Sequence, residues 1–552
     1  MPYLLLLLLV LSCAPAATTT MTTPPPRVVP AQPRFAANAV ARRVVLLSFD
    51  GLGADALARQ KNLAAFERLA REGASARIIN VNPTVTTSTH VSILTGADPQ
   101  RTGIVSNRFH VRGAPLDEVA RGMTADIEVE TLVEAARRQG KRVGVVSFPT
   151  VDNRTPRRSA DFGLAWSYPL VPARYVQLRA ANFRREWVPP TWSDRPQRRR
   201  SFSPIMRARI EWSVPRVTRA DVDVVAYDTT DDRVANYDTY FVETGEQELD
   251  AREWFPISQR TSSGLHGSWS KVTRATPSLD VTIYWGAIHR NDAWPESFRD
   301  LLDEQVGFWP GAAEEELEGD PEMFVAQSER LASFYTRAQT LAIARMPFDL
   351  LLAYQPQIDA ASHEYLGTAD ADRVIGAAFA SADRAVAAIV EALDPSDALV
   401  VTGDHGLVPV AREVLINRLL ADQGFAPRWR AYSSGAVAHL YRFSGPDDSA
   451  ALVNMLTASG HFERVERKSA TAHRNAGDVI AYAHPNVALT SDDVARDPRG
   501  QHGALNTHRE LHTALFAYGT GVTPGPLGDI AQTRIARYIS TLLGITPPAA
   551  AE

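Results

Sequence analysis

Acidic and imidazole side chains stand at the ends of several strongly apolar runs of this chain. The runs VVLLSF and ALVVTG are each followed directly by an aspartate, and a third aspartate comes shortly after DLLLAY. A single aspartate after a strand is more often a turn residue. Ligands, however, bind where the carboxyl ends of parallel strands meet. The candidate residues at such ends are Asp50, Thr86, Asp359, His363, Asp404, His405 and His502.

This set predicts a metal centre. Three carboxylates and three imidazoles that met at one sheet edge without a cation would repel one another and lose hydration. Divalent metal ions remove that cost. Mixed aspartate and histidine ligation with open positions favours zinc over manganese.

The elements that must position these residues alternate between strand and helix. Continuous apolar runs such as 42–50, 348–355 and 397–403 are typical of strands buried on both faces of a parallel sheet. Helical patterns at 57–73, 129–140 and 373–393 separate them. We therefore predict an α/β fold with a doubly wound, mostly parallel sheet.

Two segments interrupt the alternation. Short alternating runs such as SLDVTIYWGA predict an inserted, mostly β subdomain, and GAVAHLYRF with DVIAYAHP predicts a small α+β insert. The expected parts are a catalytic core in three pieces (41–152, 346–426 and 494–548), the β insert (153–345) and the α+β insert (427–493).

The first residues predict export. The run MPYLLLLLLV has signal-peptide length and ends in VLSC, a pattern similar to the lipobox of bacterial lipoproteins. We expect residues 1–13 to be a signal peptide, Cys13 to carry the lipid that contacts the membrane, and 14–40 to be a Thr/Pro-rich tether. Cleavage near APAA is the alternative. The expected location is the periplasm or outer membrane of a Gram-negative bacterium. The net charge of −5 argues against nucleic-acid scaffold binding.

Several motifs together resemble the alkaline phosphatase superfamily, and most closely its type I phosphodiesterase/nucleotide pyrophosphatase branch. The matching stretches are LLSFDGLGAD, NPTVTTSTHVSILTG, TGIVSNRF, IDAASHEYLG, TGDHGL and QHGALNTH, in the family's order. The resemblance implies an alkaline phosphatase-like fold with two zinc ions. It assigns Asp359, His363 and His502 to one ion, and Asp50, Asp404, His405 and the nucleophile to the other.

By the same resemblance, the nucleophile is Thr86, which would form a phospho-threonine intermediate. Thr84 matches a structural threonine, and Thr87 and Ser88 are interpreted as helix-start residues. Thr89 stands where family phosphodiesterases have an asparagine, so we predict that its hydroxyl donates to a phosphoryl oxygen. His90 is interpreted as a packed helix histidine, and His508 is the alternative to His502 as a ligand.

The substrate is expected to be a small phosphate ester, preferably a diester or pyrophosphate. Monoesterase relatives carry a Lys-x-Arg pair where this chain has SFPTVDNRTP, with Arg154 alone. Phe109, Phe148 and Arg154 are candidate substrate-binding residues, the two aromatics being equally compatible with the core. A phosphomonoesterase or phosphonate hydrolase of the same superfamily, and a non-catalytic surface-binding lipoprotein, are the alternatives.

Overall fold

The computed structural model describes residues 40–115, 118–186, 200–244, 247–312, 317 and 320–552. The expected signal peptide, Cys13 and all but the last residue of the expected tether lie outside these residues. Within the described ranges, every helix is too short or too polar to cross a membrane.

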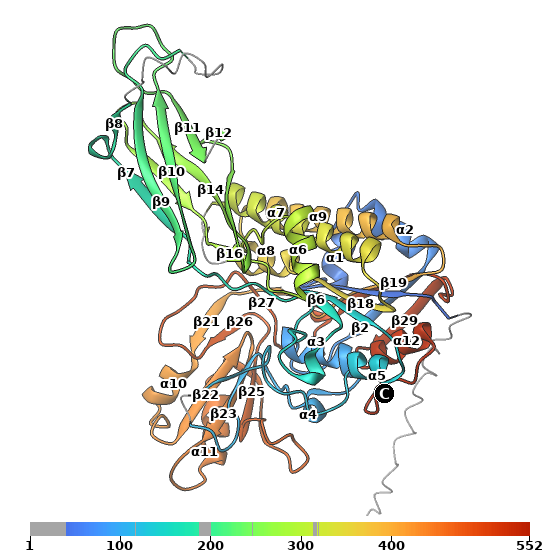
Figure 1. The fold of residues 1–552 in the computed structure, drawn as a ribbon. Helices are drawn as coiled ribbons and strands as arrows, with labels where there is room; N and C mark the ends of the chain where they lie inside the picture. The colour runs from blue at the N-terminus through green and yellow to red at the C-terminus, as the bar shows by residue number, and fades with distance from the viewer. Residues whose placement is uncertain (1–39, 116–117, 187–199, 245–246, 313–316, 318–319) are drawn as a thin grey trace, which may run out of the picture. The chain divides into compact units, whose positions relative to one another are not determined.

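A nine-stranded sheet forms the centre of the described part of the chain (Figure 1). From one edge to the other its strands are β17 (Ala293–Trp294), β6 (Phe162–Leu164), β5 (Val143–Val146), β18 (Leu350–Gln355), β1 (Val44–Phe49), β19 (Ala398–Gly403), β28 (Thr513–Gly519), β2 (Ala74–Ile79) and β29 (Gly525–Ala531). Only β17 and β28 run against the common direction. The predicted α/β, mostly parallel fold is therefore confirmed.

Strand β1 shows why an unbroken apolar run forms a central strand. All six of its residues are buried. Because side chains alternate across a strand, Val45 and Leu47 pack in the hydrophobic cluster on one face of the sheet, while Val44 and Leu46 pack in the cluster on the other. Both faces need apolar side chains because helices cover both.

Helices cover the two faces of the sheet (Figure 1). The cluster on one face takes its residues from α2 (Ala64–Glu72), α7 (Pro321–Arg345), α8 (Gln357–Tyr365) and α9 (Ala371–Ala392). The cluster on the other takes its residues from α3 (Thr86–Thr95), α5 (Leu132–Arg138) and α12 (Arg534–Leu543). Shorter elements of the core are α1 (Ala54–Arg59), α4 (Pro99–Thr102), β3 (Arg108–Phe109), β4 (Ala120–Arg121) and the 3₁₀ turns Pro156–Arg158 and Arg509–Leu511.

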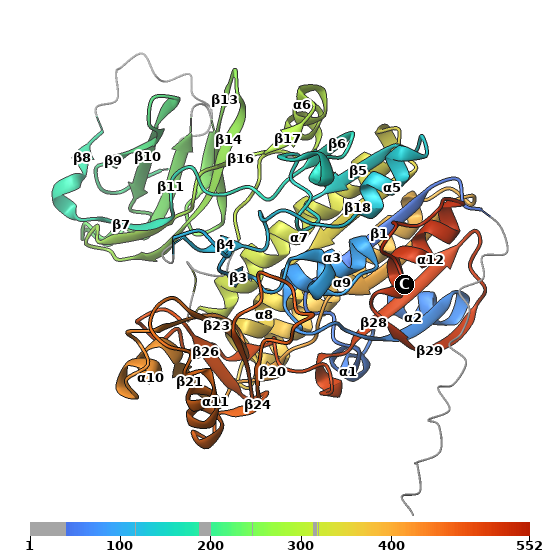
Figure 2. The ribbon, with the colours of Figure 1, turned by 90° about the horizontal axis from the view of Figure 1, so that it is seen from below.

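The large insertion is built from two antiparallel sheets that share one hydrophobic cluster (Figure 2). One sheet contains β8 (Arg184–Arg185), β9 (Met206–Val214), β10 (Thr218–Tyr227), β11 (Thr239–Thr244) and β12 (Gln247–Asp250). The other contains β7 (Arg174–Leu178), β13 (Phe255–Thr261), β14 (Gly264–Ala275), β15 (Val281–Trp285) and β16 (His289–Arg290). The 3₁₀ turn Ala180–Asn182 follows β7.

The two ends of the segment 153–345 belong to the core and not to these sheets. Strand β6 pairs in parallel with β5, β17 pairs with β6, and α7 packs along α9. Helix α6 (Glu296–Gln305) follows β17. Strands of two or three residues carry no readable period, which explains why sequence alone placed them in the insertion.

The small insertion is an α+β unit, as its sequence pattern indicates. Its sheet contains β22 (Trp429–Ser434), β23 (Val437–Arg442), β25 (Val479–Ala483) and β24 (Phe462–Arg467), with α11 (Ser449–Ala458) packed on β24. Its hydrophobic cluster also includes residues from β20 (Val408–Pro409), β21 (Arg412–Leu415), α10 (Ile416–Asp422) and β26 (Val487–Thr490). Strand β27 (Gly500–Gln501) then pairs with β20.

Candidate metal centre

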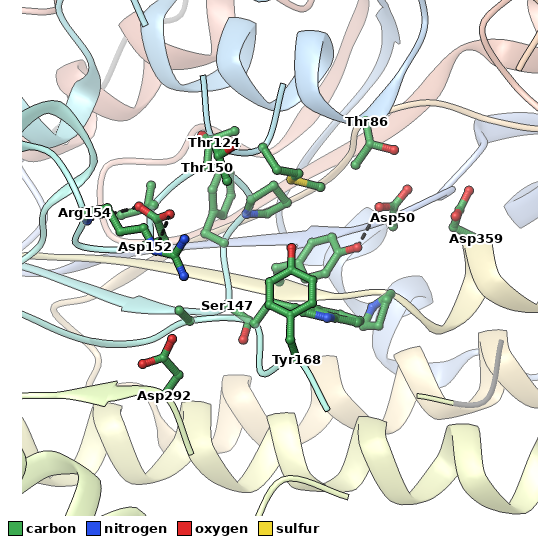
Figure 3. Close-up of a pocket in the computed structure, with 18 residues that line it drawn as sticks. Asp50, Thr86, Thr124, Ser147, Thr150, Asp152, Arg154, Tyr168, Asp292 and Asp359 are labelled. Atoms are coloured by element: carbon green, nitrogen blue, oxygen red, sulfur yellow. Dashed lines mark hydrogen bonds and ion pairs between the residues drawn. The ribbon is translucent and has the colours of Figure 1, made fainter. Parts of the chain in front are cut away.

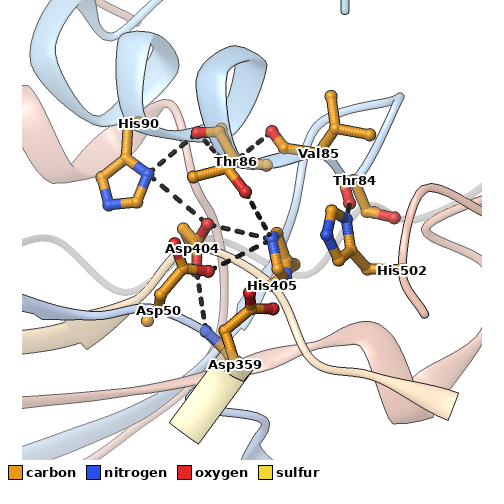
Figure 4. Close-up of polar contacts among 12 residues, drawn as sticks. Asp50, Thr84, Val85, Thr86, His90, Asp359, Asp404, His405 and His502 are labelled. Carbon is orange, nitrogen blue, oxygen red and sulfur yellow. Dashed lines mark hydrogen bonds and ion pairs between the residues drawn. The ribbon is translucent and has the colours of Figure 1, made fainter. Parts of the chain in front are cut away.

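The residues singled out in the sequence meet beyond the carboxyl ends of β1, β18 and β19 (Figure 4). Asp50 follows β1, Asp404 and His405 follow β19, and Asp359 lies on α8. Gly51 adopts a φ of +74°, and a Cβ there would come within 2.9 Å of the Asp359 backbone. Only glycine permits this close approach of the residue after Asp50 to helix α8.

One group of ligand atoms comes from Asp50, Asp404 and His405, and lies within 4.8 Å. His405 Nε2 is 3.4 Å from Asp50 Oδ1 and 3.1 Å from Asp404 Oδ2. The Thr86 hydroxyl, at the first residue of α3, lies 3.2 Å from the same nitrogen. Asp404 Oδ1 accepts from the backbone N–H of Gly51, which fixes the carboxylate.

A second group contains Asp359, His405 and His502, also within 4.8 Å. His363 joins this group, because its Nε2 lies 3.4 Å from Asp359 Oδ2, one helical turn away on α8. His363 Nδ1 donates to the carbonyl of Gly500 and His502 Nδ1 donates to that of Thr84. These bonds occupy each Nδ1, so Nε2 is the nitrogen of each ring that would bind a metal, the usual arrangement in metal-binding histidines.

Burial makes this arrangement costly without a cation. The pKa of Asp404 is raised well above its usual range by burial and then by the Asp50 carboxylate. Burial, followed by the neighbouring His502 and His363, lowers the pKa of His405 well below its usual range. Burial and His363 lower that of His502 to about 3. Neutral imidazoles beside crowded carboxylates fit divalent cations, which restore the carboxylate charge.

The hydroxyl groups around the start of α3 have different hydrogen-bond partners. The Thr87 hydroxyl donates to the carbonyl of Ser106, and the Ser88 hydroxyl donates to that of Ile104. Thr84 donates to the carbonyl of Ala504 and accepts from the N–H of Gly503, so it supports the His502 loop. Of these hydroxyls, Thr86 is the one in the metal-ligand cluster.

The structure does not bring Thr89 to the site. Its side chain is fully buried, and its hydroxyl donates to the carbonyls of Val85 and Thr86, 2.9 and 3.1 Å away. A side chain at this position of the first helical turn reaches back to the helix backbone. In this structure the Thr89 hydroxyl therefore bonds to the helix backbone and not to the metal-ligand cluster.

His90 lies directly behind the cluster. Its Nδ1 donates to the carbonyl of Thr86, and its Nε2 accepts from the Ser48 hydroxyl. Burial lowers its pKa to about 3, so the ring is neutral. It packs edge-on against Phe148 and Tyr354. The packed-helix interpretation of His90 agrees with these contacts, which also hold the first turn of α3 in place.

Two residues near the cluster, Tyr354 and Asn107, were not identified as site residues from the sequence. The Tyr354 hydroxyl donates to Asp50 Oδ2 at 2.7 Å. Asn107 Oδ1 accepts from both the N–H and the hydroxyl of Thr87, which places its amide at the start of α3. Asn107 lies within TGIVSNRF, one of the matching motifs, and that was the available signal. Tyr354 lies inside an apolar strand, where no sequence signal marked it as a site residue.

An aromatic cavity of about 300 Å³ opens beside Thr86 (Figure 3). We define it by Phe148, Trp166, Tyr168 and Tyr354, which line it together with Asp50 and Asp359. Figure 3 shows Thr86, Asp50 and Asp359 at one end and Asp152 and Arg154 at the other. Arg154 lies 3.5 Å from Asp152. The candidates Phe148 and Arg154 thus line the cavity, whereas Phe109 is fully buried in a hydrophobic cluster away from it.

A polar cavity of about 700 Å³ lies beside the histidines His363 and His502. Its wall comes from the core around β3 and from the small insertion. We define it by Asn107, Arg108, Ser433, Ser434, Thr490, Ser491, Asp492, Arg496 and Gln501. The metal-ligand cluster therefore borders two cavities of different character.

The chain is similar to known proteins over most of its length. The profile of the type I phosphodiesterase / nucleotide pyrophosphatase family matches residues 44–505. No curated protein matches at the sequence level. Solved structures of murine and human ectonucleotide pyrophosphatase/phosphodiesterase 5 are 14% identical, with TM-scores of 0.51 and 0.53, each covering 92% of this chain and 96% of that chain. An inactive threonine-to-alanine form of the murine protein, in complex with AMP, matches equally well.

Proposed function

The chain belongs to the type I phosphodiesterase / nucleotide pyrophosphatase family, and we propose that it hydrolyses phosphoric diester or pyrophosphate bonds at a two-zinc site. The observation that carries this proposal is the meeting of Thr86 with the Asp50–Asp404–His405 and Asp359–His363–His502 groups. The seven residues come from segments far apart in the chain, yet they are linked by contacts of 3.1–3.4 Å or lie in groups spanning at most 4.8 Å.

Zinc would be held by these aspartates and histidines, with the Thr86 hydroxyl beside the first group. When bound, the two cations lower the pKa of that hydroxyl, neutralise charge on the phosphoryl oxygens and activate water.

The covalent steps belong to Thr86. Its Oγ forms a bond to phosphorus while the bond from phosphorus to one alcohol breaks, and that alcohol leaves with a proton. A water oxygen then bonds to phosphorus as the bond from Thr86 Oγ to phosphorus breaks, which releases a phosphate monoester and returns the proton to the hydroxyl. We assign Asn107, in place of Thr89, as the side-chain donor to a phosphoryl oxygen. Support comes from the bonds that tie its Oδ1 to Thr87 and leave Nδ2 as the donor end.

A diester is favoured over a monoester because the cluster borders two cavities, one for each substituent. A monoester carries more charge and needs added cations near the phosphoryl group. Arg154, the arginine of the SFPTVDNRTP loop that lines the aromatic cavity, lies at the end away from Thr86 and beside Asp152.

Hydrolysis of bis-p-nitrophenyl phosphate and p-nitrophenyl phosphate by the zinc-loaded protein tests the proposal. We expect kcat/KM for the diester to exceed that for the monoester by at least about tenfold. Faster cleavage of the monoester would favour a phosphomonoesterase. Failure to cleave either ester would favour a phosphonate hydrolase or a binding protein.

We also propose that the chain is exported and carries a lipid on Cys13. The apolar run and the VLSC sequence support this. Labelling with an alkyne fatty acid in a Gram-negative host should mark the wild type and not Cys13→Ala. Label retained in the variant would contradict lipidation.

A further inference from the structure

The polar cavity has a wall built for hydrogen bonding. Phenylalanine, tryptophan and tyrosine side chains line the cavity next to Thr86, whereas the polar cavity is lined by hydroxyl, amide and charged side chains beside His363 and His502. Ser433 and Ser434 are 6% and 7% exposed, and the Ser434 hydroxyl accepts from Ser106 Oγ and from the N–H of Arg108. These contacts fix one side of the wall.

Two polar atoms of this wall lack a hydrogen bond among the described residues. Ser491 is 6% exposed and Gln501 is 1% exposed. The Ser491 hydroxyl and Gln501 Oε1 are both buried without a partner, although Gln501 Nε2 donates to the carbonyl of Pro485. Buried polar atoms are almost always paired, so these two side chains, which belong to residues that line the cavity, are the candidates to bond a ligand there.

The chemistry of these atoms selects the ligand. Gln501 Oε1 is an acceptor, so it needs a donor from the ligand. An anionic group offers acceptors alone and would also face the carboxylates of Glu364 and Asp492. The guanidiniums of Arg108 and Arg496 are already engaged with Asp492. An uncharged, hydroxylated group meets both requirements.

From this wall, and resting on the proposed function, we infer that the polar cavity binds a diester substituent rich in hydroxyl groups, of glycerol or sugar type. The other substituent lies in the aromatic cavity. Ser491 and Gln501 determine this specificity by hydrogen bonds to hydroxyls of the substituent.

Two matched diesters test the inference: glyceryl p-nitrophenyl phosphate and propyl p-nitrophenyl phosphate. They share charge and aryl group and differ by two hydroxyls. The zinc-loaded wild type should cleave the glyceryl ester with a kcat/KM at least about tenfold higher, since an unmatched buried polar group penalises the propyl ester. Equal rates would overturn the inference and leave the proposed function intact. Cleavage of neither ester would overturn both.

Variants of the two proposed residues test whether they cause the preference for the glyceryl ester. Ser491→Ala should reduce the preference to about threefold or less while kcat/KM for the propyl ester stays within about twofold. Gln501→Met should do the same, with zinc content measured because His502 is adjacent. Ser449→Ala is the control: its side chain is also buried but lies on α11, beside Asp447 and away from the cavity. A preference that survives both Ser491→Ala and Gln501→Met would overturn the assignment.

Thermal stability gives a readout that needs no turnover. Glycerol 3-phosphate should raise the Tm of the wild type more than the same concentration of propyl phosphate does, because a tighter ligand stabilises the folded state more. Ser491→Ala should abolish this difference. Equal shifts for both monoesters in the wild type would contradict the inference.

Discussion

The aromatic cavity and the polar cavity border one metal-ligand cluster but are built from different parts of the chain. Phe148 and Tyr354 of the aromatic cavity come from the core, and Trp166 and Tyr168 follow β6, where the chain leaves for the large insertion. Ser433, Thr490 and Ser491 of the polar cavity come from the small insertion. Under the proposed function, the core supplies the metal-ligand cluster, while the segment that follows β6 and the small insertion each shape the space for one substituent.

The largest effect should come from a change that does not distinguish the cavities. Thr86→Ala should reduce kcat by about 10³-fold or more for every diester, because the covalent step is lost for all of them. Thr89→Ala should reduce kcat by less than about threefold, since that hydroxyl contacts only the helix backbone. Steady-state rates on aryl and glyceryl diesters provide the measurement. Comparable losses in the two variants would contradict the assignment of Thr86.

Asp404→Asn should have the next largest effect on activity. Removing a carboxylate from the buried group should lower zinc affinity and reduce activity about 10²-fold on both substituents. The Tm of the wild type should fall on chelation, whereas that of the variant should change little. Asp303→Asn, at a buried carboxyl of α6, is the control and should retain zinc. Full zinc content in Asp404→Asn would contradict its role as a ligand.

Tyr168→Ala should separate the two cavities. Tyr168 is 59% exposed, so its removal should spare the fold. Loss of an aromatic contact should lower kcat/KM for aryl diesters roughly fivefold. Glyceryl methyl phosphate, which has no aryl group, should be unaffected. Leu170→Ala, at an exposed residue (45%) outside the cavity, is the control. A uniform loss on both substrates would remove the distinction between the cavities.

The smallest effect concerns the rim of the polar cavity. Arg108 and Asp492 link β3 to the small insertion through an ion pair whose side chains are 38% and 36% exposed. Arg108→Gln should therefore lower the free energy of unfolding by about 1 kcal/mol or less. It should reduce the glyceryl preference about threefold. Arg112→Gln breaks a similar pair with Asp478 outside the cavity and should leave that preference unchanged. Equal effects of both variants on specificity would argue against a rim role.

The structure could be predicted from the sequence where a local hydrophobic pattern is compatible with one kind of element. The runs that became β1 and β19 are buried on both faces, so their composition alone indicated central strands and placed Asp50 and Asp404 at one edge. Prediction from the sequence failed where contacts between distant segments determine the position of a side chain. Thr89 donates to its own helix backbone and Tyr354 contacts Asp50 from inside an apolar strand, while Phe109, equally compatible with core and cavity by sequence, lies in the core. No local pattern encodes those contacts.

The central claim is that the Asp50–Asp404–His405 and Asp359–His363–His502 groups hold two catalytic cations. Elemental analysis of protein purified without added metal, measured beside diesterase activity during titration with a chelator, tests it most directly. We predict two zinc ions per chain and activity that falls in step with zinc removal. Full activity in protein that contains no transition metal would contradict the account.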